Sequence, residues 1–379
     1  MDVENLEPTT VVMVHAGSAI AVGLAAHTAF NLTQLREPQF TGNTITEPVS
    51  ILIPARNEAS TIEAAVRSAS NQMGLADLEI IVMDDDSSDE TAEIVNRLAQ
   101  SDPRIRLMRS TENIPAGWMG KQFACHRLSR EARGSILVFL DADVTLEPHA
   151  VAACGELMRV HGFAMVAPYP RQLASGTVER LVQPLVVWSW AATLPVGIAE
   201  NSLRPSLSAA NGQLLVVDSG KYHAIGGHES VQSVVLEDIA LMRELKKSGE
   251  RCVTVNGSAL AQCRMYDTTT DLVEGYAKSL WSAFGSAAGS LAISALLATA
   301  YIVPAAGMLT SRKRSTRMVG ALGYGAGVLS RGLVAHRTAS PVLPDSLAHP
   351  ASVATFIGLT ALSWSRHLRG TNTWKGRTL

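Results

Sequence analysis

Short apolar runs alternate with helical patterns between residues 49 and 140, and this alternation restricts the fold more than any other feature. The runs have strand length and occupy residues 49–53, 78–83, 105–108 and 136–140. Helical spacing separates them at residues 59–72, 89–99 and 120–132. Buried strands joined by helices form crossover units with a parallel sheet covered by helices. The sequence therefore predicts an α/β domain with a mostly parallel sheet.

Composition indicates that other parts of the chain lie in lipid. Hydrophobic residues make up 47% and charged residues 17%, whereas soluble domains carry about a quarter charged residues. Residues 11–32 lack Asp, Glu, Lys and Arg, and they are long enough to cross a bilayer. No basic stretch precedes them, so we expect an anchor and not a cleaved signal peptide. Further membrane helices are predicted at residues 289–309, 318–334 and 351–364.

These features predict three regions: an N-terminal anchor over residues 1–40, an α/β domain over 41–285, and a C-terminal transmembrane region with a basic tail over 286–379. Acidic residues before the anchor and Arg36 after it favour a cytosolic α/β domain. The strongly basic residues 312–317 also favour the cytosol, yet a single crossing at 289–309 places them outside. The sequence leaves this conflict open.

Charge and cysteine content exclude two classes of function. The net charge is −2 and aromatic residues make up 5%, so neither a basic field nor a stacking platform for nucleic acid is expected. The cysteines Cys125, Cys154, Cys252 and Cys263 form no Cys-x-x-Cys pair. We therefore expect reduced thiols, with neither a zinc knuckle nor a redox motif.

Polar motifs follow the first two predicted strands. Ligands of parallel sheets bind beyond the carboxyl ends of the strands. The loop that contains Pro54, Arg56 and Glu58 follows the first strand and can offer Glu58 to a base or ribose; the alternative is a helix entry with ordinary capping charges. In the second loop, Asp84 or Asp85 is expected to accept hydrogen bonds from a nucleobase N–H or a ribose hydroxyl. The alternative is ordinary helix capping, because Asp and Ser are good caps.

Two further motifs suit a diphosphate and a cation. Residues 114–121 place two glycines and Lys121 at the start of a helix, where an anion binds well. Their spacing is not that of a Walker loop, so ATP hydrolysis is not predicted. Asp141 and Asp143 follow the fourth strand one residue apart. They are expected to hold Mg²⁺ or Mn²⁺, which prefers oxygen ligands and stabilises a leaving diphosphate.

A fifth motif, Glu237-Asp238, opens a predicted helix. Transfer to a hydroxyl requires a base, and Asp238 is the candidate with Glu237 beside it. The alternative is a pair of acids favoured by the helix dipole.

In this order, the five motifs resemble the family 2 glycosyltransferases, which have the GT-A fold, from about residue 49 to 280. The resemblance implies that Asp85 contacts the base, Asp143 the metal and Asp238 the acceptor hydroxyl, with Asp86 in the position of a family glycine.

A narrower resemblance is to the membrane glycosyltransferases of carotenoid and hopanoid clusters. The matching segments are residues 115–121, 211–213, 226–229, 264–266 and 374–377. This resemblance implies a lipid-like acceptor, with Asn211 and Gly212 in the acceptor region.

Polymer-forming synthases of the family carry Gln-x-x-Arg-Trp, whereas this chain has Gln262-Cys263-Arg264-Met265-Tyr266. The difference favours a single transfer. Arg264 is expected to approach the diphosphate; the alternative is a solvated charge at a strand end.

The apolar residues 181–199 contain Trp188 and Trp190. Pro184 and Pro195 argue against a regular spanning helix. We expect this segment at the membrane surface, bringing the acceptor to the site; a buried hydrophobic helix is the equal alternative.

Together these observations predict an inverting transferase that moves a sugar from a UDP-sugar to a hydroxyl or carboxyl of a lipid-like acceptor. It would be a multi-pass protein of the inner membrane. The alternatives are a nucleotidyltransferase and a non-catalytic membrane subunit that binds nucleotide-sugars.

Overall fold

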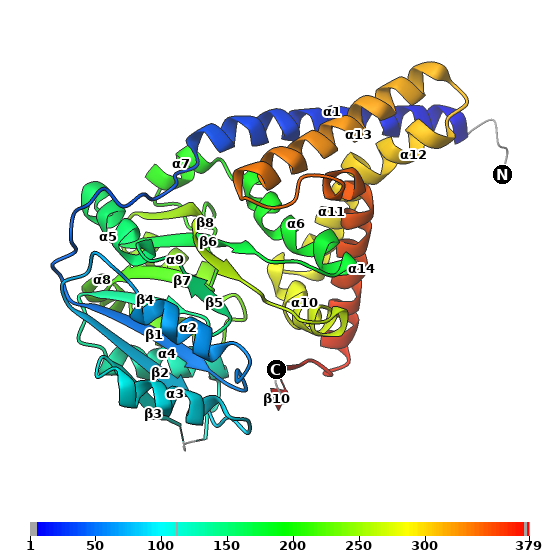
Figure 1. Cartoon of the computed structure of the whole chain (residues 1–379). Coiled ribbons are helices and arrows are strands. Elements are labelled where there is room, and N and C mark those ends of the chain that lie inside the picture. Colours follow the sequence, from blue (N-terminus) through cyan, green and yellow to red (C-terminus); the bar gives the residue numbers. More distant parts are fainter. Residues whose placement is uncertain (1–5, 111–112, 375–376, 379) are drawn as a thin grey trace. The chain divides into compact units, whose positions relative to one another are not determined.

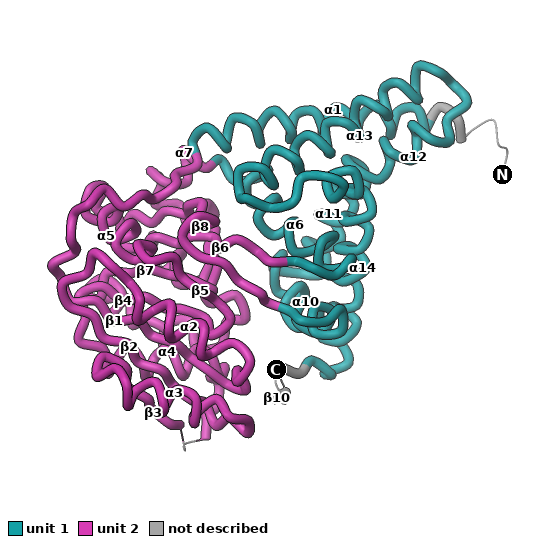
Figure 2. Tube along the Cα trace, in the orientation of Figure 1, with its two compact units in different colours: residues 1–34, 174–195, 266–379 teal, residues 35–173, 196–265 magenta. Residues whose placement is uncertain are grey.

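The computed structural model describes residues 6–110, 113–374 and 377–378, and the chain divides into two compact units (Figures 1 and 2). Unit 1 consists of Met1–Gln34, Ala174–Pro195 and Tyr266–Leu379, and unit 2 consists of Leu35–Leu173 and Val196–Met265. The predicted boundaries after residues 40 and 285 stay predictions. Each unit contains segments that are distant in the sequence.

Unit 2 is built on one sheet. Among the described residues, eight strands pair in the order β3-β2-β1-β4-β7-β6-β8-β5. Their bounds are β1 (Val49–Ala55), β2 (Leu78–Asp84), β3 (Ile105–Arg109), β4 (Ile136–Leu140), β5 (Val144–Leu146), β6 (Met165–Gln172), β7 (Leu214–Asp218) and β8 (Cys252–Cys263). The pairs β1–β2, β1–β4, β2–β3 and β6–β8 are parallel, whereas β4–β7, β6–β7 and β5–β8 are antiparallel. The predicted α/β class with a mostly parallel sheet is confirmed, and β1 to β4 begin at the predicted residues.

Helices cover both faces of this sheet, because alternate side chains of a strand point in opposite directions. Ile51 and Ile53 of β1 belong to one core, and Leu52 between them belongs to the other. The helices of the first core are α2 (Ile62–Ser70), α3 (Thr91–Ser101) and α5 (Ala150–His161); those of the second are α4 (Gly120–Glu131), α8 (Ser219–Ala224) and α9 (Glu237–Lys247). Each buried aliphatic side chain contributes about 1.5–3 kcal/mol to folding. The remaining short elements of unit 2 are α7 (Val196–Asn201) and η2 (Gly227–Val231).

The described residues of unit 1 are helical apart from the short antiparallel strands β9 (Thr373–Trp374) and β10 (Arg377–Thr378). Its helices are α1 (Leu6–Gln34), α6 (Thr177–Thr193), α10 (Thr269–Ala283), α11 (Ala287–Leu297), α12 (Val303–Thr310), α13 (Arg314–Arg337) and α14 (His349–Leu368). The π-helical η3 (Ala298–Ile302) joins α11 to α12, and the 3-10 helix η4 (Asp345–Ala348) precedes α14. Pro304 follows η3 and cannot donate an N–H to the previous turn, so the wider turn accommodates it.

Three helices in the described part of the chain are long and apolar enough to cross a membrane. They are Thr9–Gln34, Ala287–Thr310 and Arg314–Arg337, and they include the predicted residues 11–32, 289–309 and 318–334. The fourth expected segment, residues 351–364, lies in α14, which does not meet this criterion. His349, Arg366 and His367 flank its apolar part and lower the hydropathy of α14, so this measure does not support a spanning helix there.

Glycines allow the helices of unit 1 to approach closely. A Cβ atom on Gly17 of α1 would lie 2.0 Å from the carbonyl oxygen of Thr299, and one on Gly323 of α13 would lie 2.5 Å from Ser18 Oγ. Small residues at such contacts are typical of helices packed in lipid, where close backbone approach replaces the hydrophobic effect.

The helix α6 runs through Pro184 and ends before Pro195. Because proline has no N–H, the carbonyl of Arg180 loses its helical donor. Arg331 of α13 replaces that donor: its Nη2 lies 2.7 Å from the Arg180 oxygen. Its Nη1 lies 3.3 Å from the Leu181 oxygen. The Arg331 side chain is fully buried, so its hydrogen bonds satisfy carbonyl groups inside the helix packing.

Trp188 and Trp190 are buried within unit 1. Trp188 Nε1 donates to Ser330 Oγ at 2.8 Å, and Ser330 Oγ lies 3.0 Å from Thr28 Oγ1. These bonds join α6, α13 and α1. The arrangement corresponds to the buried-helix alternative for residues 181–199.

Candidate active site

The loops after β1 and β2 are bonded to each other. The Asp85 N–H donates to the Ala55 oxygen at 2.8 Å, and Arg56 Nη1 donates to the Asp85 oxygen at 2.5 Å. Asn57 Oδ1 accepts the Ser88 N–H at 2.8 Å. Pro54, at the end of β1, leads into this pair of loops. The two predicted nucleotide-binding motifs therefore form one structural element at the carboxyl edge of the sheet.

Backbone conformation explains two residues of these loops. Asn57 and Asp86 have φ values of 53° and 58°, in the left-handed region that Asn and Asp tolerate better than other side chains. Asp86 therefore adopts a conformation suited to the glycine that the family resemblance places there.

The predicted acids of these loops are in different surroundings. Asp84 and Asp85 are buried, and Asp84 Oδ1 accepts the Ser87 N–H at 3.3 Å. Glu58 is partly buried, and its N–H donates to Thr91 Oγ1 at 2.8 Å. The Asp84 carboxyl group thus closes the loop.

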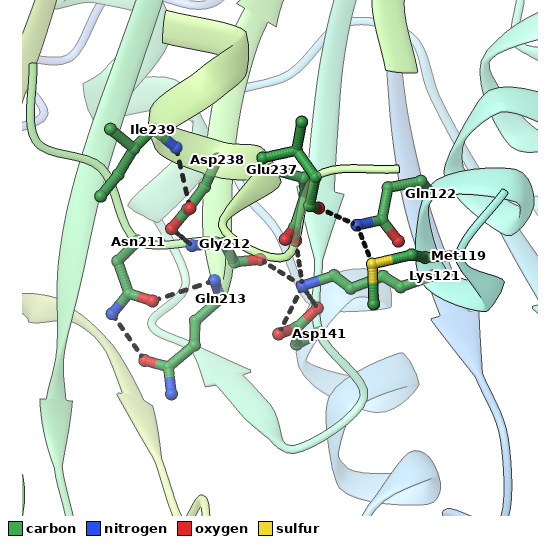
Figure 3. A network of polar contacts seen from close by, with 11 residues as sticks. Met119, Lys121, Gln122, Asp141, Asn211, Gly212, Gln213, Glu237, Asp238 and Ile239 are labelled. Carbon is green, nitrogen blue, oxygen red and sulfur yellow. Dashed lines mark hydrogen bonds and ion pairs between the residues drawn. The ribbon is translucent and has the colours of Figure 1, made fainter. Parts of the chain in front are cut away.

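Lys121, in the first turn of α4, connects three distant segments (Figure 3). Its Nζ lies 2.7 Å from Asp141 Oδ1, 3.1 Å from Glu237 Oε1 and 3.2 Å from the Gly212 oxygen. Burial alone would lower the pKa of Lys121, but the Asp141 and Glu237 carboxylates raise it well above its ordinary value. Burial would likewise raise the pKa of Glu237, but Lys121 lowers it. These groups therefore form a charged cluster at neutral pH.

Asp238 lies beside this cluster at the start of α9. Its Oδ2 accepts the Gly212 N–H at 2.8 Å, and its Oδ1 accepts the Ile239 N–H at 2.8 Å (Figure 3). Burial, together with the negative charge of Glu237, raises the pKa of Asp238 to about 7. A carboxyl group with such a pKa can both accept and release a proton near neutral pH.

Asp143 has the features of a cation ligand. Its Oδ1 is buried and has no hydrogen-bond partner among the described residues. Burial raises its pKa to about 7, assisted by the negative charges of Asp141 and Glu58. The part of the chain that the structure describes contains no group of three or more His, Cys, Asp or Glu side chains suited to a metal. Mg²⁺ commonly binds through one or two carboxylates plus phosphates and water, so Asp141 and Asp143 fit such an ion.

The predicted acceptor residues Asn211 and Gly212 precede β7. Asn211 Nδ2 donates to Gln213 Oε1 at 2.9 Å, and Gln213 Nε2 donates to Cys263 Sγ at 3.0 Å. The loop is thereby fixed to β8, which holds Gly212 against Lys121 and Asp238.

Three other predicted residues lie at the end of β8 and in unit 1. Arg264 is exposed at the end of β8, and Trp188 and Trp190 belong to unit 1. In the tail motif, residues 375–376 lie outside the described residues.

Two buried side chains next to the cluster were missed as functional candidates. Tyr222 and His228 hydrogen-bond through the Tyr222 hydroxyl and His228 Nδ1 at 2.7 Å. In the sequence, only the glycine pair Gly226-Gly227 pointed to a close contact here. A Cβ on Gly227 would lie 2.4 Å from the Tyr222 ring. Glycine at this position therefore makes room for the bond.

Comparison with known proteins identifies the domain. Residues 50–194 match the family model described as Glycosyl transferase family 2. This part of the chain is therefore similar to a family 2 glycosyl transferase domain. The match includes the Asp-x-Asp motif and ends before Gly212 and Asp238, which unit 2 places beside it.

Two sequence relatives of the chain carry the same name. The chain is 28% identical over 240 residues to the 4,4'-diaponeurosporenoate glycosyltransferase of Staphylococcus haemolyticus, covering 62% of this chain and 61% of that protein. It is 26% identical over 345 residues to the Staphylococcus aureus (strain USA300) protein of the same name, covering 87% of each. The first of these matches spans less than two thirds of the relative.

The chain also resembles a solved structure. This is a mannosyltransferase from Pyrobaculum calidifontis in complex with GDP-Man and Mn²⁺, with a TM-score of 0.52 and 18% identity. The likeness covers 93% of this chain and 98% of that chain, and it supports the GT-A-like fold.

Proposed function

We propose that the chain is an inverting glycosyltransferase that moves a sugar from a UDP-sugar to a hydroxyl or carboxyl group of a lipid-like acceptor. The observation that carries the proposal is the convergence of two motifs. Asp141 of the Asp-x-Asp motif and Glu237 of the Glu-Asp motif both contact Lys121, and Gly212 links Lys121 to Asp238. These contacts support our proposal of a base beside a diphosphate site.

The donor would bind at the carboxyl edge of β1, β2 and β4. The bonded loops of Arg56 and Asp85 would hold the nucleoside, and Lys121 would contact the diphosphate. Mg²⁺ or Mn²⁺ held by Asp143 and Asp141 would supply positive charge that stabilises the leaving diphosphate. Arg264 remains a proposed diphosphate contact.

The base then acts at the acceptor. Asp238 takes the proton of the acceptor hydroxyl while the hydroxyl oxygen forms a bond to the anomeric carbon of the sugar. The bond between that carbon and the diphosphate oxygen breaks, and the nucleoside diphosphate leaves. One displacement of this kind inverts the anomeric centre. A carboxylate acceptor reacts without the proton transfer.

The relatives and the apolar helices support a lipid-like acceptor. Two relatives are named for the glycosylation of 4,4'-diaponeurosporenoate. Three helices among the described residues are long and apolar enough to cross a membrane. We place the enzyme in the inner membrane with unit 2 in the cytoplasm, where nucleotide-sugars are made, and Arg36 directly after α1 agrees with this side.

The test uses detergent-solubilised full-length protein and a panel of nucleotide-sugars that includes UDP-glucose. Nucleoside diphosphate release is measured with Mn²⁺ or EDTA, with and without a carotenoid carboxylic acid, for the wild type and for Asp143→Ala and Asp238→Asn. We expect metal-dependent UDP release that both substitutions reduce by at least a hundredfold, with UDP binding kept in Asp238→Asn.

Other outcomes identify the alternatives. Release of pyrophosphate instead of UDP would indicate a nucleotidyltransferase. UDP binding without release from any donor, with acceptor present, would indicate a binding subunit.

A further inference from the structure

The ammonium group of Lys121 has no donor left for a ligand. An ammonium carries three N–H donors. The Lys121 ammonium contacts three residues: the Asp141 carboxylate at 2.7 and 3.0 Å, Glu237 Oε1 at 3.1 Å and the Gly212 oxygen at 3.2 Å. To bind a diphosphate, Lys121 must therefore release one of these partners.

Asp141 is the partner that another cation can take over. Lys121 Nζ lies across both oxygens of the Asp141 carboxylate, where a divalent cation would bind. The neighbouring Asp143 Oδ1 is buried without a hydrogen-bond partner. The ammonium thus occupies one half of the proposed cation site, and Asp143 leaves the other half available.

We propose that Lys121 and the divalent cation exchange at Asp141, so that metal binding frees the ammonium for the diphosphate. The exchange rests on the proposed function and describes how its site is regulated. Metal alone displaces an ion pair and binds weakly. When the nucleotide is also present, the freed ammonium gains a phosphate partner, so metal and nucleotide each strengthen the binding of the other.

The glycine next to Lys121 extends the exchange to the base. The Gly212 oxygen accepts from Lys121, and the Gly212 N–H donates to Asp238 Oδ2. A movement of the ammonium toward the diphosphate removes the hydrogen bond on the C=O side of Gly212, while the N–H side of the same residue holds Asp238. Lys121 is therefore a positioning residue for Asp238 as well as a contact of the donor.

The test measures binding and requires no turnover. Full-length protein in detergent is titrated with Mn²⁺ alone, followed by the electron paramagnetic resonance signal of free Mn²⁺, and with UDP at saturating Mn²⁺ by calorimetry. In Lys121→Met we expect Mn²⁺ alone to bind about tenfold more tightly and UDP about tenfold more weakly. Lys121→Arg keeps the cation, so its Mn²⁺ affinity should stay near that of the wild type.

Two controls separate exchange from simple charge repulsion. Lys221→Met removes the same charge from an ion pair with Glu250, at similar exposure and outside the cluster, and should leave both affinities unchanged. In an Asp141→Asn background, Lys121→Met should no longer tighten Mn²⁺ binding, because the contested carboxylate is gone. Tightening that persists in that background would overturn the exchange.

Failure of the exchange and failure of the proposed function give different results. If the wild type binds both Mn²⁺ and UDP but Lys121→Met matches it, the exchange is wrong and the proposed function stands. If the wild type binds neither, the proposed function and the exchange are both overturned.

Discussion

The backbone N–H of Gly212 donates to the side chain of Asp238 at 2.8 Å. A Cβ on Gly212 would lie 3.1 Å from both Glu237 Oε1 and Lys121 Nζ, which is closer than ordinary contact. A glycine at this position therefore lets the loop before β7 bond to Asp238 without displacing Lys121 or Glu237.

Gly212→Ala should disturb the base without unfolding unit 2. The methyl group displaces Lys121 and Glu237 by a few tenths of an ångström, and misplacement of catalytic groups costs about a hundredfold in rate per ångström. We expect kcat for donor turnover to fall about ten- to a hundredfold, with a small change in Tm. Gly220→Ala in α8 is the control, since its Cβ meets nothing nearer than 3.4 Å. Equal rates for the two variants would contradict the prediction.

The rate should depend on pH through Asp238. The carboxyl group must be ionised to accept a proton, and burial and Glu237 raise its pKa to about 7. With a hydroxyl acceptor, kcat/KM should therefore fall as the pH drops below about 7. Glu237→Gln removes a negative neighbour and should move this limb to lower pH. The measurement is kcat/KM from pH 5 to 9. If kcat/KM falls at the same pH in both proteins, Glu237 does not raise the pKa of Asp238.

The same carboxyl group should destabilise the fold at high pH. Its pKa is raised from 3.8 to about 7 in the folded protein, so its contribution to stability is present below about pH 4 and lost as the pH rises through 7. Asp238→Asn keeps a neutral side chain at every pH. The Tm of the variant minus that of the wild type should therefore rise between pH 4 and 8, by an amount equivalent to at most about 4 kcal/mol. A constant difference would show that the raised pKa is absent.

Two glycines of α13 should differ sharply on substitution. A Cβ on Gly323 would lie 2.5 Å from Ser18 Oγ, whereas one on Gly325 meets nothing within 4 Å. Gly323→Ala should cost about 1–3 kcal/mol by overpacking, and Gly325→Ala should gain up to about 1 kcal/mol from helix propensity. Thermal unfolding in detergent compares them, and similar Tm values would count against the packing of α1 on α13.

Pro184 and Arg331 should show coupled effects on stability. Arg331→Met leaves the Arg180 carbonyl without a donor, which costs about 1–3 kcal/mol. Pro184→Ala supplies a helical N–H to that carbonyl. Arg331→Met should therefore cost less in the Pro184→Ala background, as measured by a double-mutant cycle of unfolding free energies. Additive effects would show that the two residues act independently.

The first four strands of the sheet could be predicted because each is a short apolar run separated from the next by a helical pattern. The periodicity that predicts β1 to β4 is local, and each strand begins at the expected residue. The later strands were not predicted in detail. β6 to β8 lie in the half of the sheet that mixes parallel and antiparallel pairs, where pairing depends on contacts between residues distant in sequence.

The candidate site was predictable as residue types but not as contacts. The positions of Asp141, Glu237 and Lys121 at element ends indicated their chemistry. Nothing local in the sequence shows that one ammonium joins all three segments, because that follows from how α4, β4 and α9 meet. The buried position of Trp188 was undecided for the same reason, since its partner Ser330 lies in a distant helix.

The division of unit 1 among three stretches of sequence has a consequence for synthesis. Residues 35–173 and 196–265, which form unit 2, are complete before α13 has been translated. The side of α1 that carries Gly17 and Ser18 therefore cannot pack against Thr299 and Gly323 until those residues have been translated. During that interval lipid can cover this side, whereas α6, which is translated earlier, can already bond to α1 through Asn31. Truncation after residue 265 should accordingly give a nascent chain with an assembled sheet and a first helix that lacks its partners at Gly17 and Ser18.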